Sequence, residues 1–445
     1  MDFEERARRV YLDTGTKFQR PIIWSMGLIK YAAAYANAEL GLLPRRLAAA
    51  IMGASLEVME GVHDAEVYVD VFQTGSGTGL NMNINDVIAR RASEIAGSRV
   101  HPNDHVNMGQ SSNDVVPSAV RIAAIKTAED ELMPALSALI GRLSEKSAEF
   151  SKVVKPGRTH LRDALPVTLG QELGAYADAL AHGCRELRDV LAYVGEIPLG
   201  GTAVGTGFGT HPRFRRLAID AINKTSGLRL SEGNTFRGMR LLTDVLYLSA
   251  ALRNIAVELM RLAQDVRLMF SGPTAGLAEI DLPSQAEVPG SSMMPGKINP
   301  VTAEAVMLAA AQIVGLDHAN QAAAGLGEFE LAMGIPLIGY NVVAQINLLS
   351  EASGKLSELV IADMKPRRDR LRDLAERSPA LATALAPALG YEGVSQVVRK
   401  ISEGKSIRVA LEEVGRPDLA QEIPDVDNMA QAPEAERRID CDSYK

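Results

Sequence analysis

The sequence of 445 residues contains few aromatic residues and only two cysteines, Cys184 and Cys441. Two thiols are too few for the three or four thiolates of an iron–sulfur cluster, and too few for a framework of several disulfide bonds. We therefore expect chemistry that uses no metal cluster. Aromatic residues make up 4% of the chain, whereas hydrophobic residues, mainly alanine and leucine, make up 47%. This balance favours helices.

The sequence also lacks a basic run and a long apolar run free of charge. The net charge is -8, with lysine and arginine interleaved among the acids, which argues against nucleic acid or an anionic membrane as a partner. The first twenty residues are dense in charge and lack the apolar stretch of a secretory signal. The apolar segment 239–270 is interrupted by charges such as Asp244 and Arg253, so it belongs inside a bundle. We expect a cytoplasmic protein.

Helical periodicity runs through most of the chain. Apolar residues recur at helical spacing over 22–60, where the turn 41–44 separates two helices, and again over 132–143. Further long helices are predicted at 167–194, 239–270, 302–324 and 337–363, and shorter helices follow residue 366.

These patterns predict a mainly α fold with three domains. They are an N-terminal helical domain (1–110), a central long-helix bundle (111–364) and a small C-terminal helical domain (365–445). The last twenty or so residues have no periodicity, and we expect them to fray. The long helices carry more apolar surface than one bundle covers, which favours a bundle shared between subunits.

The segment 290–300, GSSMMPGKINP, combines glycine, proline, two hydroxyls, a lysine and an amide. It is too polar for a core and too irregular for a helix, and it predicts a turn-rich loop. Lys297 offers three donors on a point charge and Asn299 offers an amide, which suit a small carboxylate. Ser291 is a candidate reacting hydroxyl if neighbouring backbone N–H groups lower its pKa. Composition alone fits a mobile surface loop equally well.

Three further polar clusters interrupt the helices, at 74–79, 101–114 and 155–164. The first is rich in glycine but lacks the lysine and spacing of a P-loop, so it is equally a flexible connector. His101 and His105 are four residues apart, but the proline between them argues against the helix face that a metal site would need. A lone histidine in the third cluster is, by itself, more typical of a hydrogen-bonded structural residue.

Polar clusters of this kind cost free energy in a simple bundle unless they converge, and together they resemble the fumarase/aspartase superfamily. The segment 290–300 matches the superfamily signature G-S-S-x-M-P-x-K-x-N-P at every fixed position. The likeness covers nearly the whole chain, continuing through 74–83, 101–114, 157–163 and 328–331.

Within the superfamily the chain is similar to the class II fumarases, the iron-free enzymes that interconvert fumarate and (S)-malate. The fumarase pattern G-R-T-H stands at 157–160, where aspartases place glutamine at the histidine. The chain departs from the fumarase pattern at Gly79-Leu80, where Gln-Ser is common, and at 234–237, where a more acidic stretch is usual. These departures bear on substrate specificity more than on reaction class.

The resemblance implies roles for individual residues. Hydration of a double bond between two carboxylates needs a base for a weakly acidic C–H and a firm grip on the carboxylate that receives the developing charge. By resemblance Ser291 is that base in the malate direction, and His160, oriented by Glu304, handles the hydroxyl that leaves as water. The expected substrate-binding residues are Ser76, Gly77, Thr78, Ser111, Ser112, Asn113, Thr159, Ser292, Lys297, Ile298 and Asn299. The superfamily's second dicarboxylate site matches His101, Pro102, Asn103 and Asp104.

The resemblance further implies no metal or other cofactor, a role in the tricarboxylic acid cycle, and a homotetramer whose sites each combine segments from three subunits. Helix length points the same way, because the ends of a helix of nearly thirty residues lie up to about 40 Å apart. One subunit would not easily bring 111–113, 159–160 and 291–299 together.

Two alternatives stay open. Another lyase of the superfamily, acting on aspartate or an amino-succinate, would need only a small change around His160. A non-catalytic scaffold on the same fold is the other alternative, although such a scaffold has no need of Ser291, His160, Lys297 and Asn299 together.

Overall fold

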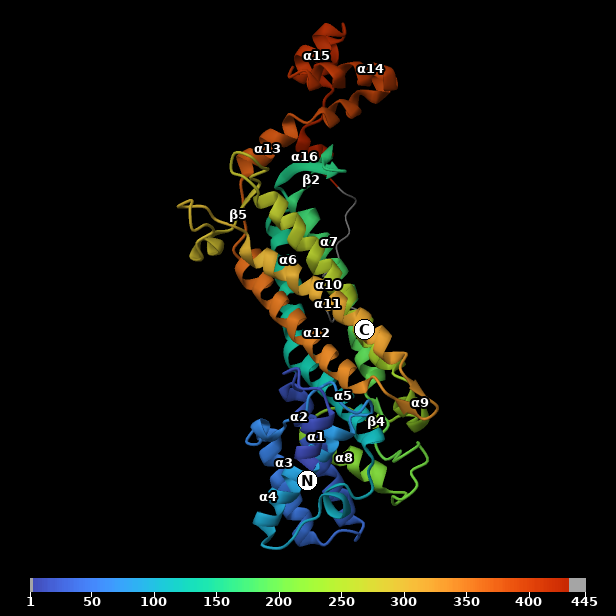
Figure 1. Ribbon diagram of the computed structural model, residues 1–445. Helices are drawn as coiled ribbons and strands as arrows, with labels where there is room; N and C mark the ends of the chain where they lie inside the picture. Colours follow the sequence, from blue (N-terminus) through green and yellow to red (C-terminus); the bar gives the residue numbers. More distant parts are fainter. Residues whose placement is uncertain (1–2, 432–445) are drawn as a thin grey trace. The chain divides into compact units, whose positions relative to one another are not determined.

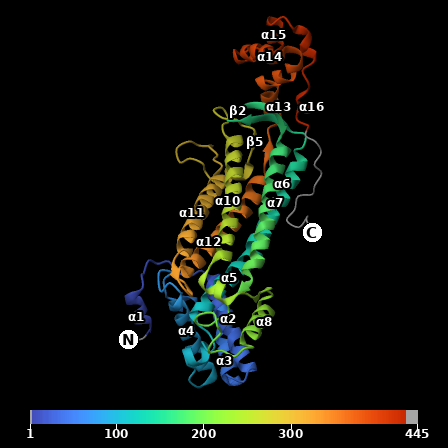
Figure 2. The same ribbon diagram turned by 90° about the vertical axis from the view of Figure 1, so that its right-hand side faces the viewer.

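The computed structural model describes residues 3–431 and is mainly helical, with only short strands (Figure 1). Long helices occupy the middle of the chain, as the apolar periodicity predicts (Figure 2). They are α6 (Met133–Glu149), α7 (Leu169–Val194), α10 (Thr243–Phe270), α11 (Val301–Ala324) and α12 (Ile335–Leu356). Within residues 3–431, no helix is both long enough and apolar enough to cross a membrane.

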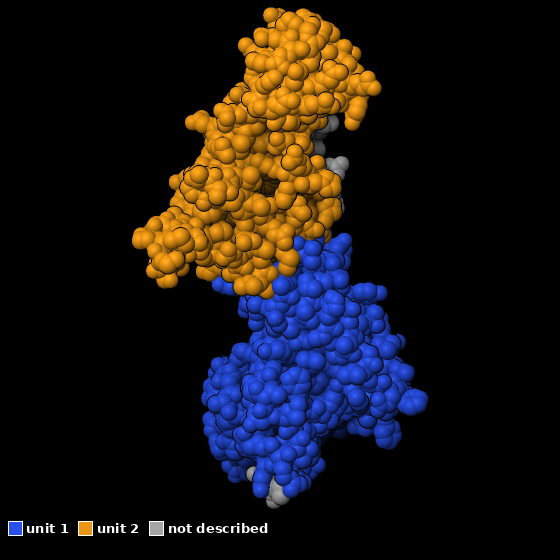
Figure 3. Space-filling model, turned by 45° about the horizontal axis from the view of Figure 1, so that its top comes forward, with its two compact units in different colours: residues 1–134, 183–257, 309–351 blue, residues 135–182, 258–308, 352–445 orange. Residues whose placement is uncertain are grey.

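The chain divides into two compact units, coloured separately in Figure 3. Unit 1 comprises Met1–Pro134, Gly183–Val257 and Ala309–Glu351, and unit 2 comprises Ala135–His182, Glu258–Leu308 and Ala352–Lys445. The three domains expected from the sequence are a different division of the chain and stay a prediction.

Unit 1 contains the N-terminal helices, and α2 (Arg20–Glu39) and α3 (Arg45–Glu60) are separated at Gly41–Pro44 as expected. The α2 helix carries Pro21 in its first turn, and α3 begins after Pro44 and ends at Gly61, whose φ of +87° closes the helix. Ile22, Met26 and Ile29 of α2 are buried against neighbouring helices. The helices are α1 (Phe3–Val10), α2 (Arg20–Glu39), α3 (Arg45–Glu60), α4 (Thr78–Ala96), α5 (Ser112–Thr127), α8 (Phe214–Ser226) and α9 (Thr235–Arg240).

Two short sheets lie within unit 1. Strand β3 (Glu196–Ile197) pairs in parallel with β4 (Ser231–Glu232), and β6 (Gly327–Glu328) pairs with the antiparallel β7 (Leu331–Ala332). The extended segment expected at 67–72 contributes only one bridge, from Asp70 to Lys17.

Unit 2 contains an antiparallel hairpin that helical periodicity did not predict. Strands β1 (Val154–Thr159) and β2 (Arg162–Thr168) pair with Val154 opposite Thr168, and the register shifts between Pro156 and Arg158. Because a proline cannot donate to a ladder, prolines in both strands concealed the hairpin in the sequence. The hairpin places Thr159 and His160 at its turn.

The C-terminal part of unit 2 has its own small core. Strand β8 (Lys365–Pro366) pairs with β5 (Ile280–Asp281), and short helices follow as predicted. They are α13 (Arg368–Glu376), α14 (Ala386–Ser402), α15 (Ile407–Glu413) and α16 (Val426–Met429), with 3₁₀ turns at Pro379–Leu385 and Pro417–Gln421. Val397, Leu411 and Leu419 are buried together. Residues 432–445 lie outside the described part of the chain, and the expectation of a frayed end stays a prediction.

Candidate active site

The hydroxyls predicted in the glycine-rich loop lie at the N-terminus of α4. Gly77 precedes the helix with a φ of +76°, and a Cβ there would meet Val116 Cγ1 at 2.7 Å, so only glycine fits this turn without strain. Thr78 Oγ1 is 2.8 Å from Ser76 Oγ and 2.8 Å from Ser112 Oγ. This chain of hydroxyls joins the first turn of α4 to the first turn of α5.

The start of α5 is a capping box. Ser111 Oγ accepts from the Asn113 N–H (3.2 Å), and Asp114 Oδ1 accepts from the Ser111 N–H (2.9 Å). The Asn113 side chain donates to the carbonyl of Ala203 (2.9 Å), in the glycine-rich segment 200–207. Asp114 thus fixes the backbone that carries the predicted substrate donors.

Asp114 is completely buried and was not predicted as a site residue. Its Oδ2 accepts from the N–H groups of Gly200 (2.9 Å) and Thr202 (3.0 Å). Burial raises the pKa of Asp114 to about 6, opposed by the three N–H donors and by the positive charge of Lys30. One buried carboxylate therefore joins the start of α5 to the segment 200–202.

The predicted second dicarboxylate site forms a π-helical turn, Pro102–Val106, in unit 1. His101 Nδ1 accepts from the Asp104 N–H (3.1 Å), and His105 Nδ1 accepts from the His101 N–H (2.9 Å). Both Nδ1 atoms are thus used within the turn. Among residues 3–431, no cluster of three metal-ligating side chains occurs.

His160 lies at the exposed turn of the β1–β2 hairpin in unit 2. His160 and Leu161 both have positive φ, 54° and 57°, the backbone of a tight two-residue turn. Leu161 is 73% exposed, and within the described residues the His160 imidazole forms no hydrogen bond or ion pair. The hairpin therefore presents Thr159 and His160 outward.

Buried charges brace the strand that leads to this turn. Lys155 Nζ is 2.6 Å from Glu172 and 3.0 Å from Glu279, and the Arg158 guanidinium donates to Glu279 (2.6 Å). Glu279 is completely buried, and burial raises the pKa of Glu172 against the opposing charge of Lys155. Sequence reasoning missed this network because its acids lie outside the polar cluster that contains Lys155 and Arg158.

The segment 290–300 is a closed loop, as predicted. The Gly290 N–H donates to the Lys297 carbonyl (3.0 Å), and Asn299 Nδ2 donates to the Gly290 carbonyl (2.7 Å). Ser291 Oγ accepts from the N–H groups of Met293 (3.2 Å) and Met294 (3.0 Å). Two donors aimed at one hydroxyl oxygen stabilise negative charge on it, which is the condition set for a reactive serine. Ser292 and Ile298 lie on the exposed part of the loop.

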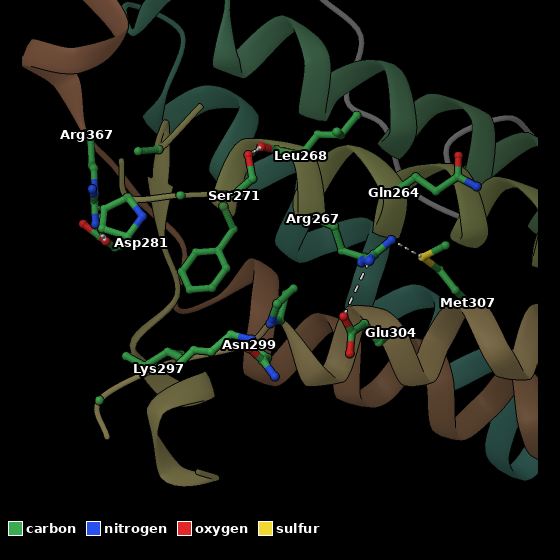
Figure 4. A pocket seen from close by; sticks show the side chains of 17 residues that line it. Gln264, Arg267, Leu268, Ser271, Asp281, Lys297, Asn299, Glu304, Met307 and Arg367 are labelled. Carbon is green, nitrogen blue, oxygen red and sulfur yellow. Dashed lines mark hydrogen bonds and ion pairs between the residues drawn. The ribbon is translucent and has the colours of Figure 1, made fainter. Parts of the chain in front are cut away.

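A cavity of about 780 Å³ in unit 2 brings several predicted residues together (Figure 4). Lys297, Ile298 and Asn299 line it, together with Glu304 from the first turn of α11. Figure 4 shows Arg267 directed at Glu304, and their side chains are 3.6 Å apart. His160 and Ser291 are not among the lining residues, so the predicted contact of His160 with Glu304 stays a prediction.

Three cationic side chains line this cavity, and they differ in whether an acidic side chain lies close to them. Arg367 is paired with Asp281 (2.5 Å), and Arg267 is near Glu304. Within the described residues, Lys297 has no acidic partner. Its exposed ammonium is therefore available to a bound anion.

The predicted residues thus fall into two groups. Ser76–Thr78, Ser111–Asn113 and the turn after His101 belong to unit 1, whereas Thr159, His160, the loop 290–300 and Glu304 belong to unit 2. Hydrogen bonds join the first two of these segments directly.

Comparison with known proteins assigns the class. Residues 3–315 match a family of lyases, and the chain belongs to this family. Among its relatives, the class II fumarate hydratase of Saccharolobus solfataricus is 56% identical over 418 residues, which cover 94% of this chain and 95% of the relative. The class II fumarate hydratase of Xylella fastidiosa strain Temecula1 is 44% identical over 397 residues, which cover 89% of this chain and 84% of the relative.

A solved structure agrees with these relatives. The class II fumarase from Schistosoma mansoni superposes with a TM-score of 0.93 at 34% sequence identity, covering 96% of this chain and 95% of that chain. The resemblance to class II fumarases and the mainly α fold are both confirmed.

Proposed function

We propose that this protein catalyses the reversible hydration of fumarate to (S)-malate, with Ser291 as the base and His160 as the partner of the hydroxyl. The activity rests on one observation above all, the 56% identity to a class II fumarate hydratase over nearly the full length of both chains. The signature at 290–300 and the G-R-T-H at 157–160 are intact.

Recognition of the substrate requires donors for two carboxylates. Lys297 supplies a charge that has no acidic partner among residues 3–431, and Asn299 supplies an amide in the same cavity. The hydroxyls of Thr78 and Ser112 supply neutral donors that are already ordered by one another. Charge that develops on a carboxylate beside the carbanion strengthens its attraction to Lys297 more than a neutral donor would.

The proton transfers use the Ser291 hydroxyl and the His160 imidazole. In the malate direction the Ser291 alkoxide removes the C–H proton, and the electron pair spreads into the neighbouring carboxylate. His160, protonated, donates a proton to the departing hydroxyl, which leaves as water while the double bond forms. The Met293 and Met294 N–H groups stabilise the alkoxide before transfer. Return of a proton from the serine to the imidazole, through solvent, resets the site.

We further propose a homotetramer in the cytoplasm, serving the tricarboxylic acid cycle. Support comes from apolar side chains left exposed on the long helices. Leu308 of α11 is 74% exposed, and Tyr247 and Val257 of α10 are 56% and 48% exposed. Packing against other copies would bury them, and large exposed apolar surface is typical of an interaction site.

A direct assay tests the activity. Purified protein incubated with (S)-malate should produce fumarate, followed by its absorbance, and aspartate should release no ammonia at a comparable rate. Imidazole exchanges a proton with a leaving hydroxyl near neutral pH, whereas an aspartase-type glutamine does not. Aspartate turnover equal to malate turnover would favour the alternative amino-succinate lyase.

A further inference from the structure

A completely buried lysine lies beside the hydroxyl cluster of unit 1. Lys30, on α2, donates to Asn81 Oδ1 (2.7 Å), Asn107 Oδ1 (2.9 Å) and Gln110 Oε1 (3.0 Å). All three partners are amide oxygens, which accept and cannot donate. Only an ammonium has three N–H donors, so this arrangement fits the charged form of Lys30.

The three amides belong to the segments that carry the predicted substrate donors. Asn81 lies in the first turn of α4, just after Thr78, and its Nδ2 donates to Asn107 Oδ1 (3.2 Å). Asn107 Nδ2 donates to the Gln110 carbonyl (3.2 Å), and Gln110 immediately precedes the N-cap Ser111. Lys30 therefore fastens the start of α4 to the turn that enters α5.

Lys30 also supplies a positive charge that the hydroxyl donors of α4 and α5 do not have. Ser76, Thr78 and Ser112 are neutral, whereas the proposed substrate carries two carboxylates. Burial lowers the pKa of Lys30 to about 7, and the negative charge of Asp114 opposes that shift. The Asp114 carboxylate is itself engaged by three backbone N–H groups, so it is already stabilised apart from Lys30.

We infer that Lys30 is a positioning residue for a substrate carboxylate, which fastens the N-termini of α4 and α5 together and adds the positive potential that their neutral donors lack. The inference rests on the proposed function, because it takes the hydroxyls of these two N-termini as carboxylate-binding groups. Two unit charges about 10 Å apart at an effective dielectric constant of about 20 attract one another enough to change affinity roughly tenfold.

Two variants separate charge from packing. Lys30→Met removes the charge and all three hydrogen bonds. Asn81→Asp keeps the ammonium and its acceptors, loses only the hydrogen bond from Asn81 to Asn107, and places a carboxylate against the ammonium, which cancels the positive charge. The control is the double variant Arg121→Met/Asp244→Asn, which removes another buried ion pair of unit 1 without changing net charge.

The readout is steady-state kinetics on (S)-malate, with thermal unfolding of each variant. We expect KM to rise about tenfold in Lys30→Met and Asn81→Asp, with a smaller change in kcat, because a charge used in both ground and transition states acts mainly on binding. The control should unfold at a lower temperature and keep the wild-type KM.

A purely structural lysine would give a different pattern. Asn81→Asp would then keep the wild-type KM, and that result overturns the inference whether or not Lys30→Met folds. A failure of the proposed function is distinguishable, because the unmodified protein would then not convert malate at all.

Discussion

The hydroxyl cluster of unit 1 and the catalytic segments of unit 2 are built in opposite ways. In unit 1 the Thr78 hydroxyl is bonded to those of Ser76 and Ser112, and the buried Lys30 and Asp114 bond to the segments that carry these hydroxyls. In unit 2 His160 and Lys297 are exposed and have no ionic partner among residues 3–431. The neutral hydroxyl donors are therefore preorganised by one another, whereas His160 and the binding residue Lys297 are presented outward.

The largest expected effect is a loss of turnover when the catalytic serine of unit 2 is changed. Ser291→Ala should lower kcat by about 10²–10⁴-fold with little change in KM, because a base acts in the transition state. The neighbouring Ser292→Ala removes the same atom from a predicted binding residue, and it should affect KM more than kcat. Near-normal turnover in Ser291→Ala would mean that the base is another residue.

The next prediction concerns the ion pairs of Glu279 with Lys155 and Arg158 of β1. Like Lys30 and Asp114 in unit 1, Glu279 and Lys155 are buried. Glu279→Gln leaves Lys155 and Arg158 without their shared carboxylate, and breaking a buried ion pair costs about 3–5 kcal/mol. Thermal or denaturant unfolding measures this loss. The exposed pair of Arg8 and Glu4 provides the control, since Glu4→Gln should change stability by less than about 1 kcal/mol. Equal effects of the two changes would contradict the assigned role of the buried network.

Removal of the Lys297 charge should have an intermediate effect on the kinetics. Lys297→Met should raise the KM for malate by roughly tenfold to a hundredfold, the range for a hydrogen bond to a charged group, and should also lower kcat. Lys355→Met makes the same change at an exposed position of α12 outside the cavity, and it should leave both constants unchanged. Unaltered binding in Lys297→Met would exclude this lysine as the carboxylate partner.

The smallest predicted effect is a pH dependence that originates in unit 1. Burial lowers the pKa of Lys30 from 10.5 to about 7, and Asp114 is the charged group that opposes the shift. The ammonium is thus present below pH 7 and is lost as the pH rises through 7, so KM for malate should rise severalfold between about pH 6 and pH 8 if charge contributes as inferred. In Lys30→Met this rise should be smaller, because only the ionisation of Asp114 then remains in this range.

The lowered pKa of Lys30 affects stability in the opposite direction from substrate affinity. Between pH 7 and 10.5 the unfolded state binds the Lys30 proton and the folded state does not, so the contribution of Lys30 to the free energy of unfolding increases with pH. A parallel loss of affinity and stability over this range would therefore need another titrating group.

The sequence predicted helices and turns, which depend on neighbouring residues. It did not predict buried contacts between residues that are far apart along the chain. The periodicity of α11 and the turn residues of 290–300 are local signals, and both elements were found. Lys30 looks like an ordinary polar residue of α2, because the three amides that bury it come from residues 51 to 80 positions away. The pairing of Arg121 with Asp244 spans 123 positions and was equally invisible.

We propose that each active site of the tetramer combines the hydroxyl cluster of one copy with His160 of a second copy and Ser291 of a third. Co-expression of Ser291→Ala with His160→Asn tests it most directly, because each variant should be inactive alone while mixed tetramers contain some sites with neither defect. We predict that the mixture converts malate to fumarate although neither parent does. Persistent inactivity in tetramers proven to contain both chains would contradict this arrangement and place Ser291 and His160 of each site on the same chain.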